Sequence, residues 1–333
     1  MLLDWLKLTR ATGLVTIFSN ITAAVVMAVY ASEGLDPKWL MKRLYQGGFS
    51  QIAWLVLASC LLYLAGMLWN DLADVGRDRT LHPRRPLPSG RIGLGAAFFV
   101  GVLLAIGALM SAALVDVHAF YAAGVVLSLI MLYNLATKDI PYVGSVTMAL
   151  VRYSHAIFAL LILGNDYLKF AIIGFGTGSN GMLLVYPTVL GCYIFGVTLI
   201  SELESRAGRR VELLVGGLFV FGSIVAGGWL LTRAHWIRAL GPGDDKLYVV
   251  GIGLSAVLGA MLFGWLLYRV GKPWLAALRS GRSEQVGPVV GAALGGILFF
   301  DALIATSAHP IGGLAILCLV PVFMIGKRFV RMD

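Results

Sequence analysis

The stretch Ala53-Trp-Leu-Val-Leu-Ala-Ser-Cys-Leu-Leu-Tyr-Leu-Ala-Gly-Met-Leu-Trp69 carries no charge and runs directly into Asn70-Asp-Leu-Ala-Asp-Val-Gly-Arg-Asp78. A helix needs roughly 20 mostly apolar residues to cross a bilayer, so this stretch predicts a membrane span that ends in carboxylates. The whole chain shares this character, because 59% of its 333 residues are hydrophobic, 13% are charged and the mean hydropathy is +0.86. Soluble proteins are about 45–50% apolar, so a soluble globular protein is excluded.

Ten apolar stretches of this kind follow one another along the chain, and we expect one all-α transmembrane domain over residues 1–333. The predicted spans are 12–31, 50–70, 92–114, 117–136, 142–164, 182–201, 211–232, 247–269, 286–307 and 311–327. The last two are separated only by Ala308-His-Pro310, so nine spans is the alternative count. Cys60, Cys192 and Cys318 are odd in number and lie in apolar stretches, which excludes a secreted disulfide scaffold.

The basic residues are unevenly divided between the two sides of these spans. When the spans alternate in direction, 18 of the 26 Lys and Arg fall on the side of the N-terminus and seven on the other, with Arg152 inside a span. The positive-inside rule then predicts both termini in the cytoplasm and favours ten crossings. We expect the membrane to be a bacterial inner membrane. The net charge of +9 is explained by this topology and by contact with membrane lipid, without a nucleic-acid partner.

Three carboxylates lie on one helical face at the end of the second span. Asp71, Asp74 and Asp78 are separated by three and four residues, and such side chains repel one another unless a cation lies among them. Mg²⁺ prefers a few carboxylate oxygens and is completed by water and substrate phosphates. Asn70 adds an amide ligand. The arginines that follow at once are suited to binding a diphosphate, and they are Arg79, Arg84 and Arg85.

The segment Asn70-Asp-Leu-Ala-Asp-Val-Gly-Arg-Asp78, followed by Arg85-Pro-Leu-Pro-Ser-Gly90, resembles the UbiA superfamily of intramembrane prenyltransferases. The resemblance implies a helical bundle whose central cavity opens to lipid. It also implies Mg²⁺ held by two acidic motifs, and transfer of an isoprenoid chain from a prenyl diphosphate to an acceptor. Tyr133 and Lys138 resemble the family's Tyr-x-x-x-Lys element with one extra residue, which implies catalytic roles for them beside Asp71 and Asp74. Lys138 is equally explained as an inner-leaflet anchor.

The second acidic motif, at residues 201–208, departs from the family pattern. Ser201, Glu204 and Gly208 occupy its three positions, and Glu202 offers a carboxylate out of register. We expect Glu202 and Glu204 to contribute to a weaker metal site, with Arg206 and Arg209 neutralising part of the diphosphate. This departure resembles the EboC branch of UbiA-like proteins.

Other polar residues inside spans are candidates for substrate binding, because such residues are costly in lipid. The candidates inside spans are Asn20, Arg152, Tyr153, His155 and Tyr193, and Arg10 joins them at the foot of the first span. Arg152 has a structural alternative, which is a pair with Asp301, and Asn20 has another, which is an interhelical hydrogen bond.

The predicted function is Mg²⁺-dependent prenyl transfer to an unidentified small acceptor. Two alternatives remain open, namely a UbiA-like protein that carries a lipid or metabolite without transferring it, and a UbiA-type terpene cyclase. The sequence leaves the chain length of the donor and the oligomeric state undetermined.

Overall fold

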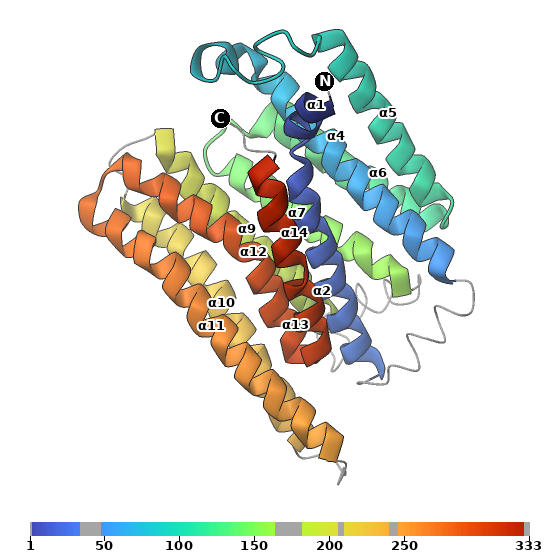
Figure 1. The fold of residues 1–333 in the computed structure, drawn as a ribbon, viewed down its shortest axis with the longest axis vertical. Helices are drawn as coiled ribbons and strands as arrows, with labels where there is room; N and C mark the ends of the chain where they lie inside the picture. Colours follow the sequence, from blue (N-terminus) through green and yellow to red (C-terminus); the bar gives the residue numbers. More distant parts are fainter. Residues whose placement is uncertain (1, 34–47, 164–181, 206–209, 240–245, 330–333) are drawn as a thin grey trace.

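The computed structural model describes residues 2–33, 48–163, 182–205, 210–239 and 246–329, and every regular element within them is helical (Figure 1). The elements are α1 (Leu2–Leu8), η1 (Ala11–Gly13), α2 (Leu14–Glu33), α4 (Phe49–Leu81), α5 (Leu94–Ala113), α6 (Val117–Leu132), η3 (Tyr133–Thr137), α7 (Val143–Leu160), η4 (Leu161–Leu163), α9 (Met182–Ser201), η6 (Glu202–Ser205), α10 (Arg210–Ala239), α11 (Lys246–Ser280), η7 (Ser283–Gln285), α12 (Val286–Ala308), α13 (Pro310–Leu317) and α14 (Leu319–Phe329).

Nine helices of the described part are long and apolar enough to cross a membrane. This makes the chain an integral membrane protein with the predicted all-α architecture. Pro310 starts a new helix, α13, after α12 ends. The tenth predicted span is divided at Cys318 into the short helices α13 and α14. Gly312 packs against Val26 near the end of α2, and Gly326 packs against Thr12 near its start. The two short helices together therefore run antiparallel to α2 and return toward the end of the bundle where α1 lies (Figure 1).

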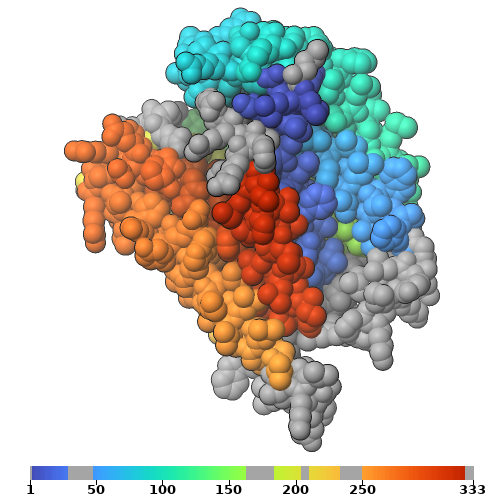
Figure 2. Space-filling model, in the orientation of Figure 1, coloured from blue at the N-terminus to red at the C-terminus, as the bar shows by residue number. Residues whose placement is uncertain are grey.

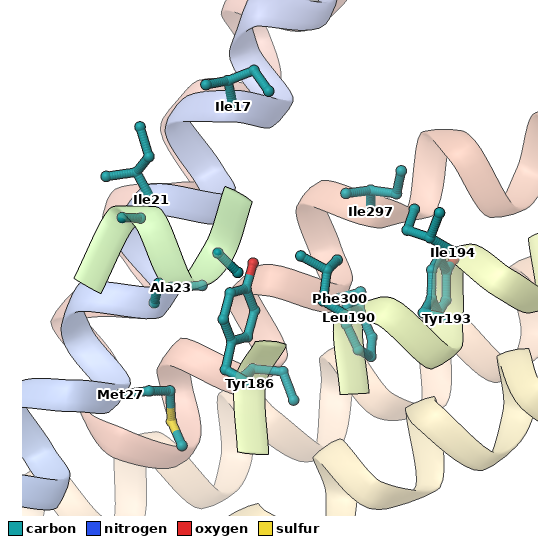
Figure 3. Packing of buried hydrophobic residues seen from close by; sticks show 14 of the residues in the cluster. Ile17, Ile21, Ala23, Met27, Tyr186, Leu190, Tyr193, Ile194, Ile297 and Phe300 are labelled. Atoms are coloured by element: carbon teal, nitrogen blue, oxygen red, sulfur yellow. The ribbon is translucent and has the colours of Figure 1, made fainter. Parts of the chain in front are cut away.

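The core is formed where α2, α9 and α12 meet, and Figure 3 shows it at close range. Small residues of α2 let the helices approach, and Ala23 and Ala28 are completely buried. Tyr186 and Phe300, from α9 and α12, are also completely buried. The chain must fold α12 between α2, α10 and α11 for this core to form, which places α12 at the centre of the bundle.

Large apolar side chains cover the outside of the bundle, as expected for helices that face lipid. On α5, for example, Phe99 is 62% exposed and Met110 is 64% exposed. Figure 2 shows α14 lying beside the N-terminal helices on one face of the molecule. The polar residues considered next lie inside the bundle or at the end that carries α1.

Candidate active site

A cavity of about 480 Å³ is lined by residues of α2, α4, α6 and α7. The side chains around its mouth are polar and mostly charged, and those deeper in the membrane are mostly apolar. Charged residues that line it are Arg10, Asp74, Arg77, Arg85, Lys138, Asp139 and Arg152, and apolar ones are Ile17, Leu62, Met67, Val126, Ile130, Met148 and Val151. The cavity thus combines a charged mouth with an interior that is mostly apolar but also holds Arg152 and His155. Its lateral opening toward lipid stays a prediction.

Asp74 is the carboxylate of the first acidic motif that lines this cavity. Lys138 donates from Nζ to Asp74 Oδ1 over 2.7 Å, and Arg77 Nη2 lies 3.1 Å from the same oxygen. The Asp74 side chain is only 10% exposed, so the pair with Lys138 is shielded from solvent. Arg77 Nη1 also lies 3.9 Å from Asp139 Oδ1. The charged residues that line the cavity are nevertheless mostly basic, which favours an anionic ligand.

Asp71 and Asp78 are buried and act on the cavity through arginines. Asp71 Oδ1 accepts a hydrogen bond from Arg10 Nη2 over 3.0 Å, and Asp78 Oδ2 accepts one from Arg85 Nη1 over 2.5 Å. Both arginines line the cavity, whereas the two carboxylates do not. Arg10 also has a left-handed backbone conformation, with φ of 46°, between α1 and η1. The two acids therefore hold guanidinium groups at the mouth.

A π-helical turn brings Tyr133 and Lys138 to the cavity together. The Lys138 N–H donates to the Tyr133 carbonyl over 3.0 Å, which is a bond across five residues, and η3 is a π-helix. Such a turn accommodates one residue more than an α-helical turn and is frequent at functional sites. The extra residue in the Tyr-Lys spacing is therefore absorbed by the backbone, and both side chains line the cavity.

Sequence comparison decides the family. The model of the UbiA prenyltransferase family matches residues 19–276, which is most of the chain. The chain belongs to the UbiA prenyltransferase family. Among UbiA relatives, the digeranylgeranylglyceryl phosphate synthase of Pyrococcus horikoshii is 33% identical over 120 residues, covering 35% of this chain and 43% of that protein. The synthase of Methanococcus aeolicus is 27% identical over 195 residues, covering 55% and 62%. The chain thus spans about half the length of the curated relatives it matches.

Solved structures share the UbiA fold with this chain. An apo UbiA homologue from Aeropyrum pernix superposes with a TM-score of 0.52 at 19% identity, covering 87% of this chain and 96% of that one. A structure of digeranylgeranylglyceryl phosphate synthase gives a TM-score of 0.57 at 16% identity, covering 92% and 97%. These likenesses concern the fold, and the predicted UbiA-type bundle is confirmed.

The donor set at the UbiA first motif fits Mg²⁺ as part of a site that substrate completes. Asp74 offers carboxylate oxygens at the cavity, and Asn70 lines it with an amide. Within the described ranges, no group of three His, Cys, Asp or Glu residues lies close enough to hold a metal ion alone. Mg²⁺ is commonly held by one or two carboxylates plus water and substrate phosphates, so this donor set is adequate only with a bound diphosphate.

The second UbiA motif has a structural use that the sequence did not predict. Glu202 Oε1 accepts a hydrogen bond from Ser145 Oγ over 2.6 Å, and Oε2 accepts one from the Tyr142 N–H over 3.2 Å. Glu202 therefore binds the first turn of α7, whose N–H groups lack helical partners, and it does not line the cavity. The role of Glu202 as a metal ligand stays a prediction, and its carboxylate is bound to α7 in this structure. The Glu204 side chain, Arg206 and Arg209 lie outside the described residues.

A buried polar network lies beneath the cavity and uses Asp301. This carboxylate is fully buried and accepts hydrogen bonds from Ser19 Oγ at 2.6 Å, Asn20 Nδ2 at 2.7 Å and Tyr186 OH at 2.9 Å. Arg152 Nη1 donates to Asn20 Oδ1 over 3.4 Å. The expected pair of Arg152 with Asp301 is thus replaced by a link through the Asn20 amide. Asn20 itself makes the interhelical contacts that were its structural alternative.

His155 lies one turn beyond Arg152 on α7 and lines the same cavity. The residue is 4% exposed, and neither ring nitrogen has a hydrogen-bond partner among the described residues. A buried imidazole without partners is costly, so these nitrogens are available to a polar group of a bound ligand. Arg152 and His155 therefore remain candidates for substrate binding in the interior of the cavity.

Tyr193 does not take part in the cavity. Its ring is completely buried, stacks on Phe300 with 4.6 Å between centroids, and its hydroxyl donates to the Ala293 carbonyl over 2.8 Å. Figure 3 shows it among apolar side chains of α9 and α12. The expectation that Tyr193 binds substrate is therefore corrected, because every polar and apolar part of its side chain is used in the core.

Three other predicted substrate-binding residues lie away from this cavity. Arg79 is exposed near the end of α4, and Tyr153 packs beside Gly191 of α9. Arg84 lines a separate cleft on the same end of the molecule. None of them lines the central cavity, whereas the nearby Arg77 and Arg85 do.

Sequence reasoning missed two residues of the cavity on α4. Arg77 follows Asp74 by three residues, and Tyr63 precedes Asn70 by seven, so both share the face of the motif. The Tyr63 hydroxyl donates to the Arg10 carbonyl over 3.1 Å, which supports the left-handed residue. Helical periodicity extended in both directions from the motif would have found them.

Proposed function

We propose that this protein transfers an isoprenoid chain from a prenyl diphosphate to a lipid acceptor, with Mg²⁺ as cofactor. The observation that carries the proposal is the cavity, whose mouth gathers Asp74, Lys138, Arg77 and Arg10 above an apolar interior. An isoprenoid diphosphate has the same division, since its head is a polyanion and its tail is a hydrocarbon. Membership of the UbiA prenyltransferase family supports the same reaction.

The reacting end of the donor would lie at the mouth. Lys138, Arg77 and Arg85 bind diphosphate oxygens and stabilise the negative charge that develops as the allylic C–O bond breaks. Mg²⁺ held by Asp74 and the diphosphate would neutralise the leaving group further. Tyr133 lines the cavity together with Lys138, where its ring would lie near the allylic carbon and help to exclude water from it.

The acceptor is proposed from the relatives. Several relatives of this chain are digeranylgeranylglyceryl phosphate synthases, and by that name their product carries two geranylgeranyl chains on glyceryl phosphate. One of these geranylgeranyl chains would come from the donor. The acceptor proposed for this protein is therefore a glyceryl phosphate that already carries one geranylgeranyl chain. The acceptor hydroxyl attacks C1 of the donor as the bond from C1 to the diphosphate oxygen breaks, and the hydroxyl proton passes to the departing diphosphate.

We place the mouth of the cavity and both termini on the cytoplasmic side, and the bacterial inner membrane stays a prediction. The antiparallel return of α13 and α14 supports termini on one side. Single cysteines at Thr80 and Leu114, in a background where the three native cysteines are serine, test the orientation. We expect an impermeant maleimide to label Leu114→Cys in intact cells and Thr80→Cys only after lysis. Labelling in the reverse order would invert the topology.

The decisive experiment for the reaction is product analysis with purified protein. We expect wild-type protein with Mg²⁺ to release diphosphate from geranylgeranyl diphosphate and to form a prenylated acceptor, and Asp71→Ala and Asp74→Ala to lose both activity and Mg²⁺-dependent donor binding. Glu284→Gln, at an exposed position on the same side, is the matched control. Equal donor binding by Asp74→Ala in the presence of a chelator would disprove the metal-site proposal.

A second candidate is a carrier that binds prenyl lipids without transferring them. The use of Glu202 in binding α7 favours it, because this acid is then lost from the second metal site. Donor binding without diphosphate release would support the carrier. Diphosphate release with a hydrocarbon or alcohol product and no prenylated acceptor would indicate a cyclase instead.

A further inference from the structure

A second cleft, of about 410 Å³, lies on the same end of the molecule as the cavity mouth. It is formed between α1 and the loop that joins α4 to α5, two segments that also lie together in Figure 2. We call it the basic cleft, and its lining residues are Lys7, Pro83, Arg84, Arg85, Pro86, Ser89 and Arg91.

Arg91 holds the basic cleft in shape. Its Nη1 lies 2.7 Å from Asp4 Oδ1 of α1, which fixes the helix to the loop. Its Nη2 donates to the Arg84 carbonyl over 2.6 Å, and its Nε donates to Ser89 Oγ over 3.1 Å. The three donors of one guanidinium thus bind both α1 and the loop, and these specific contacts fix the shape of the cleft.

The protein neutralises only part of the charge of the basic cleft, because Arg91 and Arg85 have carboxylate partners and the other two basic residues have none within the described ranges. Lys7 and Arg84 form no ion pair with a carboxylate in the part of the chain that the structure describes. Arg85 is paired with Asp78, yet its Nε is buried and has no partner among the described residues. Clustered cations with free donors favour a phosphate, which guanidinium groups bind through paired hydrogen bonds.

The position of α1 indicates that the ligand belongs to a lipid. Leu2, Leu3 and Leu6 are 76%, 48% and 37% exposed on α1, while Lys7 turns toward the cleft. Exposed leucines next to a lysine, at the end of a membrane-spanning bundle, favour the interface of a bilayer at the level of the headgroups. With α1 at that level, the basic cleft would lie at the depth of a glycerolipid phosphate.

Arg85 joins the two sites, because it lines both the basic cleft and the central cavity. A glycerolipid whose phosphate lies against Arg84 and Lys7 would present its glycerol toward the mouth where Asp74 and Lys138 lie. We propose that the basic cleft binds the phosphate of the acceptor, a glyceryl phosphate with one isoprenoid ether chain. This assignment rests on the proposed function and adds to it a residue set that recognises the acceptor apart from the donor.

The test compares two probes in phosphatidylcholine nanodiscs, geranylgeranylglyceryl phosphate and the same lipid without its phosphate. We expect the wild-type protein to bind the phosphorylated probe about tenfold or more tightly than the other, and Arg84→Glu and Lys7→Gln to remove most of that preference. Donor affinity, measured with geranylgeranyl diphosphate and Mg²⁺, should not change. Arg279→Glu, an exposed arginine on the same side, is the control for charge reversal.

Several results would overturn the assignment. One is an equal loss of affinity for both probes in Arg84→Glu, and another is an unchanged preference for the phosphorylated probe. Competition separates the sources of phosphate. If phosphatidylglycerol in the nanodisc or millimolar inorganic phosphate displaces the phosphorylated probe as well as unlabelled probe does, the basic cleft is a general lipid or anion site and the acceptor assignment fails.

Binding and turnover also separate this inference from the proposed function. If Arg84→Glu raises the KM for the phosphorylated acceptor while the KM for the donor is unchanged, both are supported. If wild-type protein shows no transfer but still binds the phosphorylated probe through Arg84, the proposed function fails, and the basic cleft stands as a glycerolipid phosphate site.

Discussion

Lys138 Nζ donates to Asp74 Oδ1 over 2.7 Å across 64 residues of sequence, and this pair defines the mouth of the cavity. It joins the two elements that carry the family motifs, α4 and the π-helical turn after α6. An anionic substrate at this position would compete with Asp74 for the ammonium group. Lys138 could then exchange the Asp74 carboxylate for the substrate.

Lys138→Met should lower donor affinity by about 10- to 100-fold, because a hydrogen bond to a charged group contributes roughly 1.5–3 kcal/mol. Lys138→Arg should restore part of the affinity, since it keeps the charge. The measurement is titration with geranylgeranyl diphosphate in the presence of Mg²⁺. Lys272→Met, an exposed lysine on α11, is the control. An equal effect of Lys138→Met and Lys272→Met would mean that only the general surface charge matters.

Deletion of Leu135 tests the π-helical turn. Leu135 is 65% exposed, and its removal converts the turn to the α-helical spacing while leaving Tyr133 and Lys138 at the cavity. We expect donor binding to be largely retained. Deletion of Val125, which is 55% exposed within α6, should instead rotate the adjoining segment by about 100° and abolish binding. If both deletion variants still bind the donor, donor binding does not depend on the helical register of Tyr133 and Lys138.

Glu202→Ala should lower stability and leave the metal requirement unchanged. The Glu202 carboxylate holds Tyr142, whose φ of 65° is strained for a residue with a side chain, at the start of α7. Loss of such a contact costs about 1–2 kcal/mol, measured by thermal unfolding in detergent. Glu202→Gln should retain most of the stability. A tenfold rise in the Mg²⁺ concentration needed by Glu202→Gln would restore this residue to the metal site.

Asp301→Ala should destabilise the bundle by about 3 kcal/mol or more, because Ser19, Asn20 and Tyr186 would lose their shared acceptor in a buried site. Asp301→Asn keeps one acceptor oxygen and the volume of the side chain, so the loss of stability should be smaller. Unfolding in detergent with added denaturant measures both. If Asp301→Ala unfolds like the wild type, the network does not support the fold.

The membrane class, the position of most spans and the first acidic motif follow from local sequence. The apolar run before Asn70 is long enough to cross a bilayer, and the spacing of Asp71, Asp74 and Asp78 places them on one helical face whatever the rest of the chain does. These properties depend on the helix alone, so no tertiary information is needed to find them. The same is true of Lys138, which the motif spacing indicated despite its extra residue.

The partners of these residues were decided only by tertiary structure. Nothing local distinguishes Asp74, which lines the cavity, from Asp71 and Asp78, which bind Arg10 and Arg85. Nor does local pattern show that the first turn of α7 takes up Glu202, or that Asn20 stands between Arg152 and Asp301. A helical face predicts a direction, whereas a hydrogen bond depends on which other helix packs against that face. That packing is set by small residues and core side chains far apart in the sequence.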